Sequence, residues 1–156
     1  MVLAFDWETS KKPTFLPWQP GSYGVSLHIS TDCGMQLSWL FNHPECVTTI
    51  RDSIVEIQEL IDKADVIIAH NAKFDLHWLM QYGISFENTE VYCTLLAEYI
   101  LDGHATRMEA LSLDDLALKY GHPPKIDKVK EYWDAGYNTD EVPANILIEY
   151  GEWDAQ

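Results

Sequence analysis

The first six residues, Met1–Asp6, restrict the fold of this 156-residue chain more than any other segment, because they have the pattern of a buried β-strand. In an extended chain Leu3 and Phe5 point to one side and Val2 and Ala4 to the other, so both faces of the strand are apolar. Such a strand lies in the centre of a sheet that is covered on both faces. The sequence therefore predicts a layered α/β domain.

The rest of the chain divides into strand-like and helix-like segments. Two β-rich runs joined by Asp32-Cys33-Gly34 predict a hairpin, and isoleucines at helical spacing predict an amphipathic helix after it. Proline-containing segments at 11–21 and 121–139 predict loops, the second with one helical turn. The predicted strands are 1–6, 23–31, 35–41 and 66–69, and the predicted helices are 46–63, 72–82, 94–101, 113–120 and 143–156. This order predicts a mixed sheet flanked by helices in one domain, residues 1–156.

The charge balance limits the partners that this domain can hold. Twenty-five acidic residues against ten basic ones give a net charge of −15. That charge argues against a surface that coats nucleic acid, but it permits an enzyme that grips a few nucleotides through metals, stacking and backbone donors. If the substrate is a nucleic acid, we expect another domain or subunit to supply the basic surface.

The cysteines and the hydropathy of the chain indicate in which cellular compartment the protein is expected. Cys33, Cys46 and Cys93 are odd in number and lack C-x-x-C spacing, so neither a disulfide framework nor a zinc site is predicted. A reducing, cytoplasmic compartment fits best. No apolar run is long enough to span a bilayer, and we expect no membrane partner.

Four carboxylates, in three short motifs, are the candidates for chemistry. Asp6 and Glu8 end the first strand, Asp75 lies in the first turns of the helix after strand 66–69, and Asp154 ends the last helix. Asp6 and Glu8 are two apart and point to one face, at the strand end where open α/β sheets place ligands. Acids without cations in their motifs need a counter-charge, which divalent metal ions supply.

Each motif also has a plainer structural explanation when it is taken alone. An isolated D-x-E is most often a solvated strand end. Asp75 follows a natural N-cap, Asn71, and compensates the helix dipole. Tyr150 and Asp154, four apart, fit an amphipathic helix with a boundary tyrosine and a surface acid. Only the joint occurrence of the three motifs, in order and on suitable elements, favours one shared site.

That joint pattern resembles the tyrosine branch of the DEDD exonuclease superfamily, over essentially the whole chain. More narrowly, the chain is similar to the 3′–5′ proofreading domain of bacteriophage-type family A DNA polymerases. The matching residues are Asp6/Glu8 for D-x-E, Asn71/Phe74/Asp75 for N-x-x-[FY]-D and Tyr150/Asp154 for Y-x-x-x-D. Segments 94–101 and 112–117 also resemble the helices that follow the second motif in such domains.

The resemblance implies an RNase H-like (DnaQ-like) fold and a two-metal mechanism. Two Mg²⁺ or Mn²⁺ ions would be held by the four carboxylates, and Tyr150 would orient the attacking water, because a phenol stays protonated near neutral pH. Thr9, Asn71 and Phe74 would contact the nucleic acid. The implied catalytic residues are Asp6, Glu8, Asp75, Tyr150 and Asp154, of which the four acids are the metal ligands.

Two groups of lysines stand apart from the motifs. Lys11 and Lys12 follow the first motif where the family usually carries an apolar residue that wedges against the terminal base. They are either phosphate contacts or solvated loop charges. Lys125, Lys128 and Lys130 form the densest basic cluster on the chain, and we expect them near a DNA backbone.

The predicted function is removal of nucleotides from a single-stranded DNA 3′ end, as the proofreading part of a DNA polymerase. Because the sequence stops two residues after Asp154, we expect a fragment of a longer polymerase, with the polymerase domain as a partner in the same chain. If a phage encodes it, the host cytoplasm is its compartment. Two alternatives stay open: a free-standing RNA 3′-end-trimming exonuclease of the same superfamily, and a non-catalytic RNase H-like scaffold.

Overall fold

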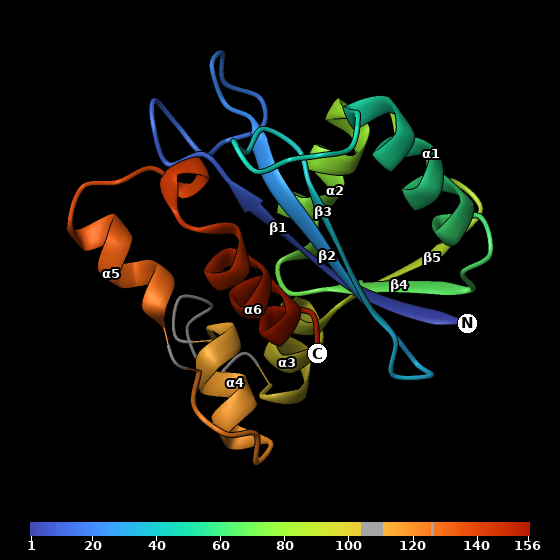
Figure 1. The fold of residues 1–156 in the computed structure, drawn as a ribbon. Coiled ribbons are helices and arrows are strands. Elements are labelled where there is room, and N and C mark those ends of the chain that lie inside the picture. The colour runs from blue at the N-terminus through green and yellow to red at the C-terminus, as the bar shows by residue number, and fades with distance from the viewer. Residues whose placement is uncertain (104–110, 126) are drawn as a thin grey trace.

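A five-stranded mixed sheet in the order β3-β2-β1-β4-β5 divides the protein into two helical layers (Figure 1). The computed structural model describes residues 1–103, 111–125 and 127–156. The strand β1 pairs antiparallel with β2 and parallel with β4, so it is central, as its two apolar faces predict. The strands are β1 (Val2–Thr9), β2 (Gly24–Thr31), β3 (Gln36–Leu40), β4 (Val66–Ala69) and β5 (Glu90–Cys93).

Helices cover both faces of this sheet. In Figure 1, α1 and α2 lie on one side of the strands and α6 lies across the other. None of the described helices is long and apolar enough to cross a membrane. The helices are α1 (Ile50–Ile61), α2 (Ala72–Gln81), α3 (Thr94–Leu101), α4 (Leu113–Lys119), α5 (Lys128–Asp134) and α6 (Ala144–Asp154), with a 3₁₀ turn at Thr139–Glu141.

The larger core lies between the sheet and the helices α1 and α2. Leu3, Phe5 and Trp7 alternate onto this face of β1 and pack with buried residues such as Ile57 of α1 and Trp78 of α2. The period of two along a strand then turns the side chains at positions 6 and 8 to the opposite face. Burial of the apolar half of β1 therefore directs both carboxylates of the first motif toward α6.

A second, smaller core anchors α5 and α6 beside β2. It consists of Val25, Val129, Val142 and Leu147. Along β1, position 8 pairs with position 26 of β2 and position 9 with position 24, which leaves Val25 as an extra residue in a β-bulge. Bulges at the ends of strands next to active sites often redirect a side chain. Here the bulged residue packs in the core beneath α6 and holds that helix near the end of β1.

The predicted α/β fold is confirmed, but several element boundaries were wrong. The strand β1 runs to Thr9 rather than to residue 6, and α1 begins at Ile50 rather than 46, after the side chain of Thr49 caps it. The helical turn predicted within segment 121–139 is the seven-residue helix α5, whose N-cap Asp127 accepts a hydrogen bond from the Lys130 backbone N–H. The prediction had no strand at β5, because this edge strand is exposed along most of its length and lacks a buried alternating pattern.

Candidate active site

Three of the four predicted carboxylates meet near the carboxyl end of β1. Asp6 and Glu8 extend from the strand, and Asp154 comes from the last turn of α6. One oxygen of each can be chosen so that all three lie within 4.8 Å of one another. Clustered carboxylate oxygens are the hard donors that Mg²⁺ and Mn²⁺ prefer, so the three residues fit a divalent cation.

The fourth predicted carboxylate, Asp75, approaches the same strand from α2. Its side chain is buried, and Oδ1 accepts a hydrogen bond from the Trp7 backbone N–H at 3.2 Å. Because Trp7 lies between Asp6 and Glu8, this bond ties α2 to the backbone of the first motif. Asp75 therefore lies beside the three-carboxylate group but outside it.

Burial raises the pKa of all four carboxyls. The pKa of Asp6 rises to about 7, through burial first and then the charge of Asp154. The pKa of Asp154 rises to about 6 because burial outweighs the opposing effect of Lys125. Burial also holds the pKa values of Glu8 and Asp75 well above the ordinary range. The metal-free site retains protons near neutral pH, which a bound cation would displace.

Lys125 brings a positive charge into this cluster. Its Nζ forms an ion pair with Asp154 Oδ2 and lies 2.9 Å from the centroid of the Tyr150 ring. Only 6% of its side chain is exposed, so the lysine is part of the site. Its two sequence neighbours in the predicted basic cluster, Lys128 and Lys130, instead pair with Glu149 and Asp134 on the surface. The motifs carried no signal of this placement.

Tyr150 lies on α6, one turn before Asp154. Burial, followed by the charges of Glu8 and Asp154, raises the pKa of its phenol. The hydroxyl therefore stays protonated at neutral pH and can donate a hydrogen bond. Its ring packs edge-to-face on Trp133 of α5 with the centroids 5.9 Å apart. This packing against α5 supports the ring within the site.

The helix α6 packs on the sheet at the buried, polar side chain of His28 on β2. The ring bonds Ser26 Oγ through Nε2 at 2.8 Å and Ser38 Oγ through Nδ1 at 2.9 Å. Burial lowers the pKa of His28 to about 3, so the ring is neutral. A Cβ built on Gly151 would lie 2.0 Å from His28 Cδ2. Only glycine at position 151 allows α6 to approach β2 this closely. The close approach sets the positions of Tyr150 and Asp154, the two site residues on α6.

The residues predicted to contact nucleic acid surround the same strand end. Thr9 is buried at the end of β1, and Phe74 is half-buried on α2. Asn71 is the N-cap residue of α2, as predicted, but its backbone is left-handed (φ 58°) and its side chain makes no capping hydrogen bond. This backbone conformation differs from that of an ordinary N-cap.

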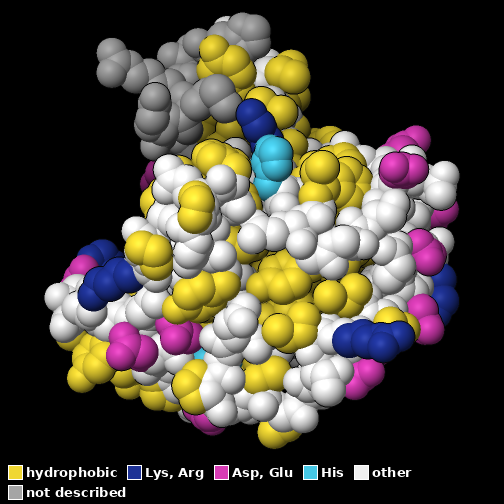
Figure 2. Space-filling view, turned by 90° about the horizontal axis from the view of Figure 1, so that it is seen from above, with side chains coloured by type: hydrophobic (Ala, Val, Ile, Leu, Met, Phe, Trp, Pro, Cys, Tyr) yellow, Lys and Arg dark blue, Asp and Glu magenta, His cyan; other side chains and the backbone are white. Residues whose placement is uncertain are grey.

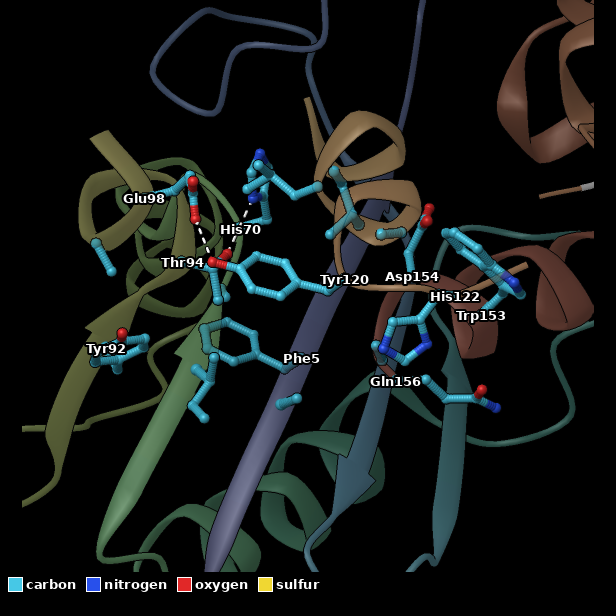
Figure 3. Close-up of a pocket in the computed structure, with 18 of the residues that line it drawn as sticks. Phe5, His70, Tyr92, Thr94, Glu98, Tyr120, His122, Trp153, Asp154 and Gln156 are labelled. Carbon is cyan, nitrogen blue, oxygen red and sulfur yellow. Dashed lines mark hydrogen bonds between the residues drawn. The ribbon is translucent and has the colours of Figure 1, made fainter. Parts of the chain in front are cut away.

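A largely apolar cavity of about 390 Å³ adjoins Asp154 (Figure 3). Its walls come from α3, α4, the strands β1, β4 and β5, and the end of α6. In Figure 3 His70, bonded to Thr94, and Glu98, bonded to Tyr120, lie across the cavity from Asp154. The carboxylate site is therefore bordered on this side by an apolar space.

The mixed five-stranded sheet with helices on both faces is consistent with an RNase H-like exonuclease fold. Residues 2–156 match a family model described as 3′–5′ exonuclease, and the chain belongs to this family. It is thus a 3′–5′ exonuclease domain related to the proofreading domains of DNA polymerases, as the motifs predict. Members of this family are typically metal-dependent, which agrees with the acidic cluster.

The relatives of similar sequence are phage DNA polymerases, and one solved polymerase structure shares the fold. The chain is 27% identical over 109 residues to the DNA polymerase DpoZ of Acinetobacter phage SH-Ab 15497, and 29% identical over 82 residues to the DpoZ of Salmonella phage PMBT28. These matches cover 69% and 53% of this chain but only 16% and 12% of the two relatives. A family B DNA polymerase from Pyrobaculum calidifontis shares the fold with a TM-score of 0.66 at 20% identity, over 99% of this chain and 23% of that one.

The first prediction concerns the contact between α6 and His28. We expect Gly151→Ala to destabilise the protein by about 1–3 kcal/mol, because the new methyl group overlaps the His28 ring. His28→Ala removes that ring and makes room for the methyl group. Urea unfolding of both single variants and the double variant measures the coupling. The free energy of unfolding of the double variant should fall by less than the sum of the falls in the two single variants. Strictly additive changes would contradict the contact.

The second prediction concerns pH. Because the pKa of Asp6 is raised from 3.8 to about 7, the folded protein binds more protons than the unfolded chain between those values, and its stability falls as pH rises through that window. Asp6→Asn removes this effect. In EDTA, the stability of the variant relative to the parent should therefore rise from about pH 4 to pH 7 and then level off. Asp62→Asn, at the exposed end of α1, is the control, and a pH-independent difference for Asp6→Asn would refute the assignment.

Proposed function

We propose that this domain hydrolyses phosphodiester bonds one nucleotide at a time from the 3′ end of single-stranded DNA. The observation that carries the proposal is the group of three carboxylate oxygens within 4.8 Å in a chain of the 3′–5′ exonuclease family. The scaffold alternative is disfavoured because a non-catalytic domain has no need to keep carboxyl groups buried together at this cost in solvation.

The acidic residues are the proposed metal ligands. Asp6, Glu8 and Asp154, with Asp75 beside them, would hold two Mg²⁺ or Mn²⁺ ions, which when bound supply positive charge at the attacking and leaving oxygens of an in-line displacement. Buried carboxyls with raised pKa values gain most from such a counter-charge. The protein's contribution is to hold these oxygens in place on β1, α2 and α6.

Two further side chains of the site act directly in the proposed reaction. The protonated phenol of Tyr150 donates a hydrogen bond to the attacking water and orients it. The ammonium group of Lys125 balances Asp154 and attracts the phosphate that enters the site. Tyr150 lies on α6 and Lys125 in the segment before α5, so packing of these parts against the sheet completes the site.

We further propose that this domain proofreads for a polymerase domain in the same, longer chain. The phage DNA polymerases that it resembles are more than five times longer than the segments aligned to it, and they support the host cytoplasm as its compartment. A second part of the chain would also supply the basic surface that a domain of charge −15 lacks. Exposed apolar side chains on β5, α3 and α4, including Tyr92, Leu101 and Leu118, offer a surface for that contact.

The central test is digestion of 5′-labelled single-stranded DNA, with the matching RNA in parallel. The parent protein should shorten the DNA from its 3′ end in Mg²⁺ and not in EDTA. Asp154→Asn should abolish cleavage with the fold intact, because it removes one of the clustered ligands. Asp62→Asn, on an exposed helix end, should cleave like the parent. A ladder on RNA would favour the RNA-trimming alternative, and full activity of Asp154→Asn would refute the assigned site.

Tyr150→Phe tests the role of the phenol separately from the metal site. We expect cleavage to slow by on the order of 10²-fold, since a positioned hydrogen-bond donor at a reacting oxygen has effects of that size. Mg²⁺ affinity, followed by the rise in melting temperature on titration, should stay unchanged because no carboxylate is altered. Tyr137→Phe, at an exposed tyrosine, is the matched control. A wild-type rate for Tyr150→Phe would remove the proposed role.

A further inference from the structure

Two large aromatic side chains stand exposed beside the carboxylate site. Phe15 and Trp18 belong to the loop between β1 and β2, and they are 50% and 60% exposed. Each contacts a ring on α2 nevertheless. The centroids of Phe15 and Phe74 are 6.3 Å apart, and Trp18 meets His77 edge-on at 5.4 Å. Each loop ring thus has a supporting neighbour on one side and solvent on another.

These rings adjoin the proposed catalytic residues. The loop leaves the end of β1, the strand that carries the first motif, and Phe74 directly precedes Asp75 on α2. Phe74 and His77 are three residues apart and share a face of that helix. Figure 2 shows the molecule from above the view of Figure 1, the side on which the loop between β1 and β2 lies, and hydrophobic side chains gather across this face. The four rings therefore form an aromatic surface at the edge of the site.

The lysines of this loop are directed elsewhere. Lys11 Nζ lies 3.8 Å from the centroid of the Trp133 ring, and Lys12 donates a hydrogen bond to the Gly136 carbonyl. Both contacts are with the segment around α5, away from α2. The phosphate-contact alternative for these lysines therefore has little support. What the loop presents beside Phe74 is aromatic surface rather than positive charge.

A protein of net charge −15 needs a way to hold a polyanion that does not depend on many phosphate contacts. Stacking of bases on aromatic rings provides one, since every base has a π-face. Unpaired bases expose these faces, whereas bases in a duplex stack on one another. An aromatic surface next to a site that acts on chain ends therefore suits a single strand.

We propose that Phe15 and Trp18, supported by Phe74 and His77, form a platform on which unpaired bases of a single-stranded nucleic acid stack as its end enters the site. The proposal rests on the proposed exonuclease function and adds to it the surface that holds the strand. Such binding is tolerant of sequence and indifferent to the sugar, because the rings contact bases.

The test is the binding of a fluorescein-labelled 12-nucleotide oligo-dT in EDTA, followed by anisotropy, so that no cleavage interferes. The double variant Phe15→Ala/Trp18→Ala should bind roughly 10- to 100-fold more weakly than the parent, the size expected from loss of base stacking. The conservative Phe15→Tyr/Trp18→Phe should retain most of the affinity. Met35→Ala/Val47→Ala, which removes exposed apolar side chains from other loops, is the matched control and should bind like the parent.

A second probe separates stacking from electrostatics. An abasic oligonucleotide of the same length keeps the phosphates but offers no bases, so the parent and the double variant should bind it equally weakly. Equal affinity of the parent and the double variant for oligo-dT would overturn the platform, as would failure of the parent to bind oligo-dT in EDTA. Urea unfolding of each variant checks that both remain folded, and this is expected because the two rings are exposed.

The same proteins distinguish failure of the platform from failure of the proposed function. If the parent cleaves DNA in Mg²⁺ while the double variant binds and cleaves like it, the platform is refuted and the function stands. If the double variant loses oligo-dT binding but the parent cleaves neither DNA nor RNA, the platform stands and the function is refuted. With both correct, the double variant should show a raised KM and a nearly unchanged kcat, because binding is lost while the reacting groups remain.

Discussion

The burial of clustered carboxyl groups at the end of β1 is the constraint on which the rest of this structure depends. Asp6, Glu8 and Asp154 bring oxygens within 4.8 Å of one another, and burial raises their pKa values. Groups that are unfavourable to bury, and that repel one another when ionised, stay together only if stronger packing holds their backbones. Two cores provide it here. One anchors β1 through its apolar face, and the other holds α6 beside the bulge at Val25.

The same constraint explains the polar features around the site. The Lys125 ammonium offsets part of the acidic charge from a segment far away in sequence, and the Trp7 backbone N–H gives Asp75 a hydrogen-bond donor. His28 is neutral and hydrogen-bonded through both ring nitrogens, so α6 packs on β2 without a charge beneath the carboxyl cluster. Each contact lowers the free energy of a site that would otherwise be unfavourable in the absence of metal.

Sequence reasoning succeeded where a property depends on near neighbours. The two apolar faces of β1 predicted its central place, and its period of two predicted that Asp6 and Glu8 share a face. Sequence reasoning failed for elements that are largely exposed, because they lack a regular apolar pattern. The strand β5 is mostly exposed at the sheet edge, and α5 buries mainly Val129. Neither therefore shows the regular spacing of apolar residues from which a strand or helix is predicted. The family was evident because its motifs are short and local.

By itself, the sequence determined the fold class, the family and which residues of each motif point the same way, because these follow from local periodicity and spacing. Only the tertiary structure decided that Lys125 enters the acidic cluster, that Asp75 turns to a backbone N–H, and that Phe15 and Trp18 pack on α2. The physical reason is that these contacts join residues of separate elements, such as positions 7 and 75, which are 68 apart. Their distances are set by how helices pack on the sheet, and no local pattern records that packing.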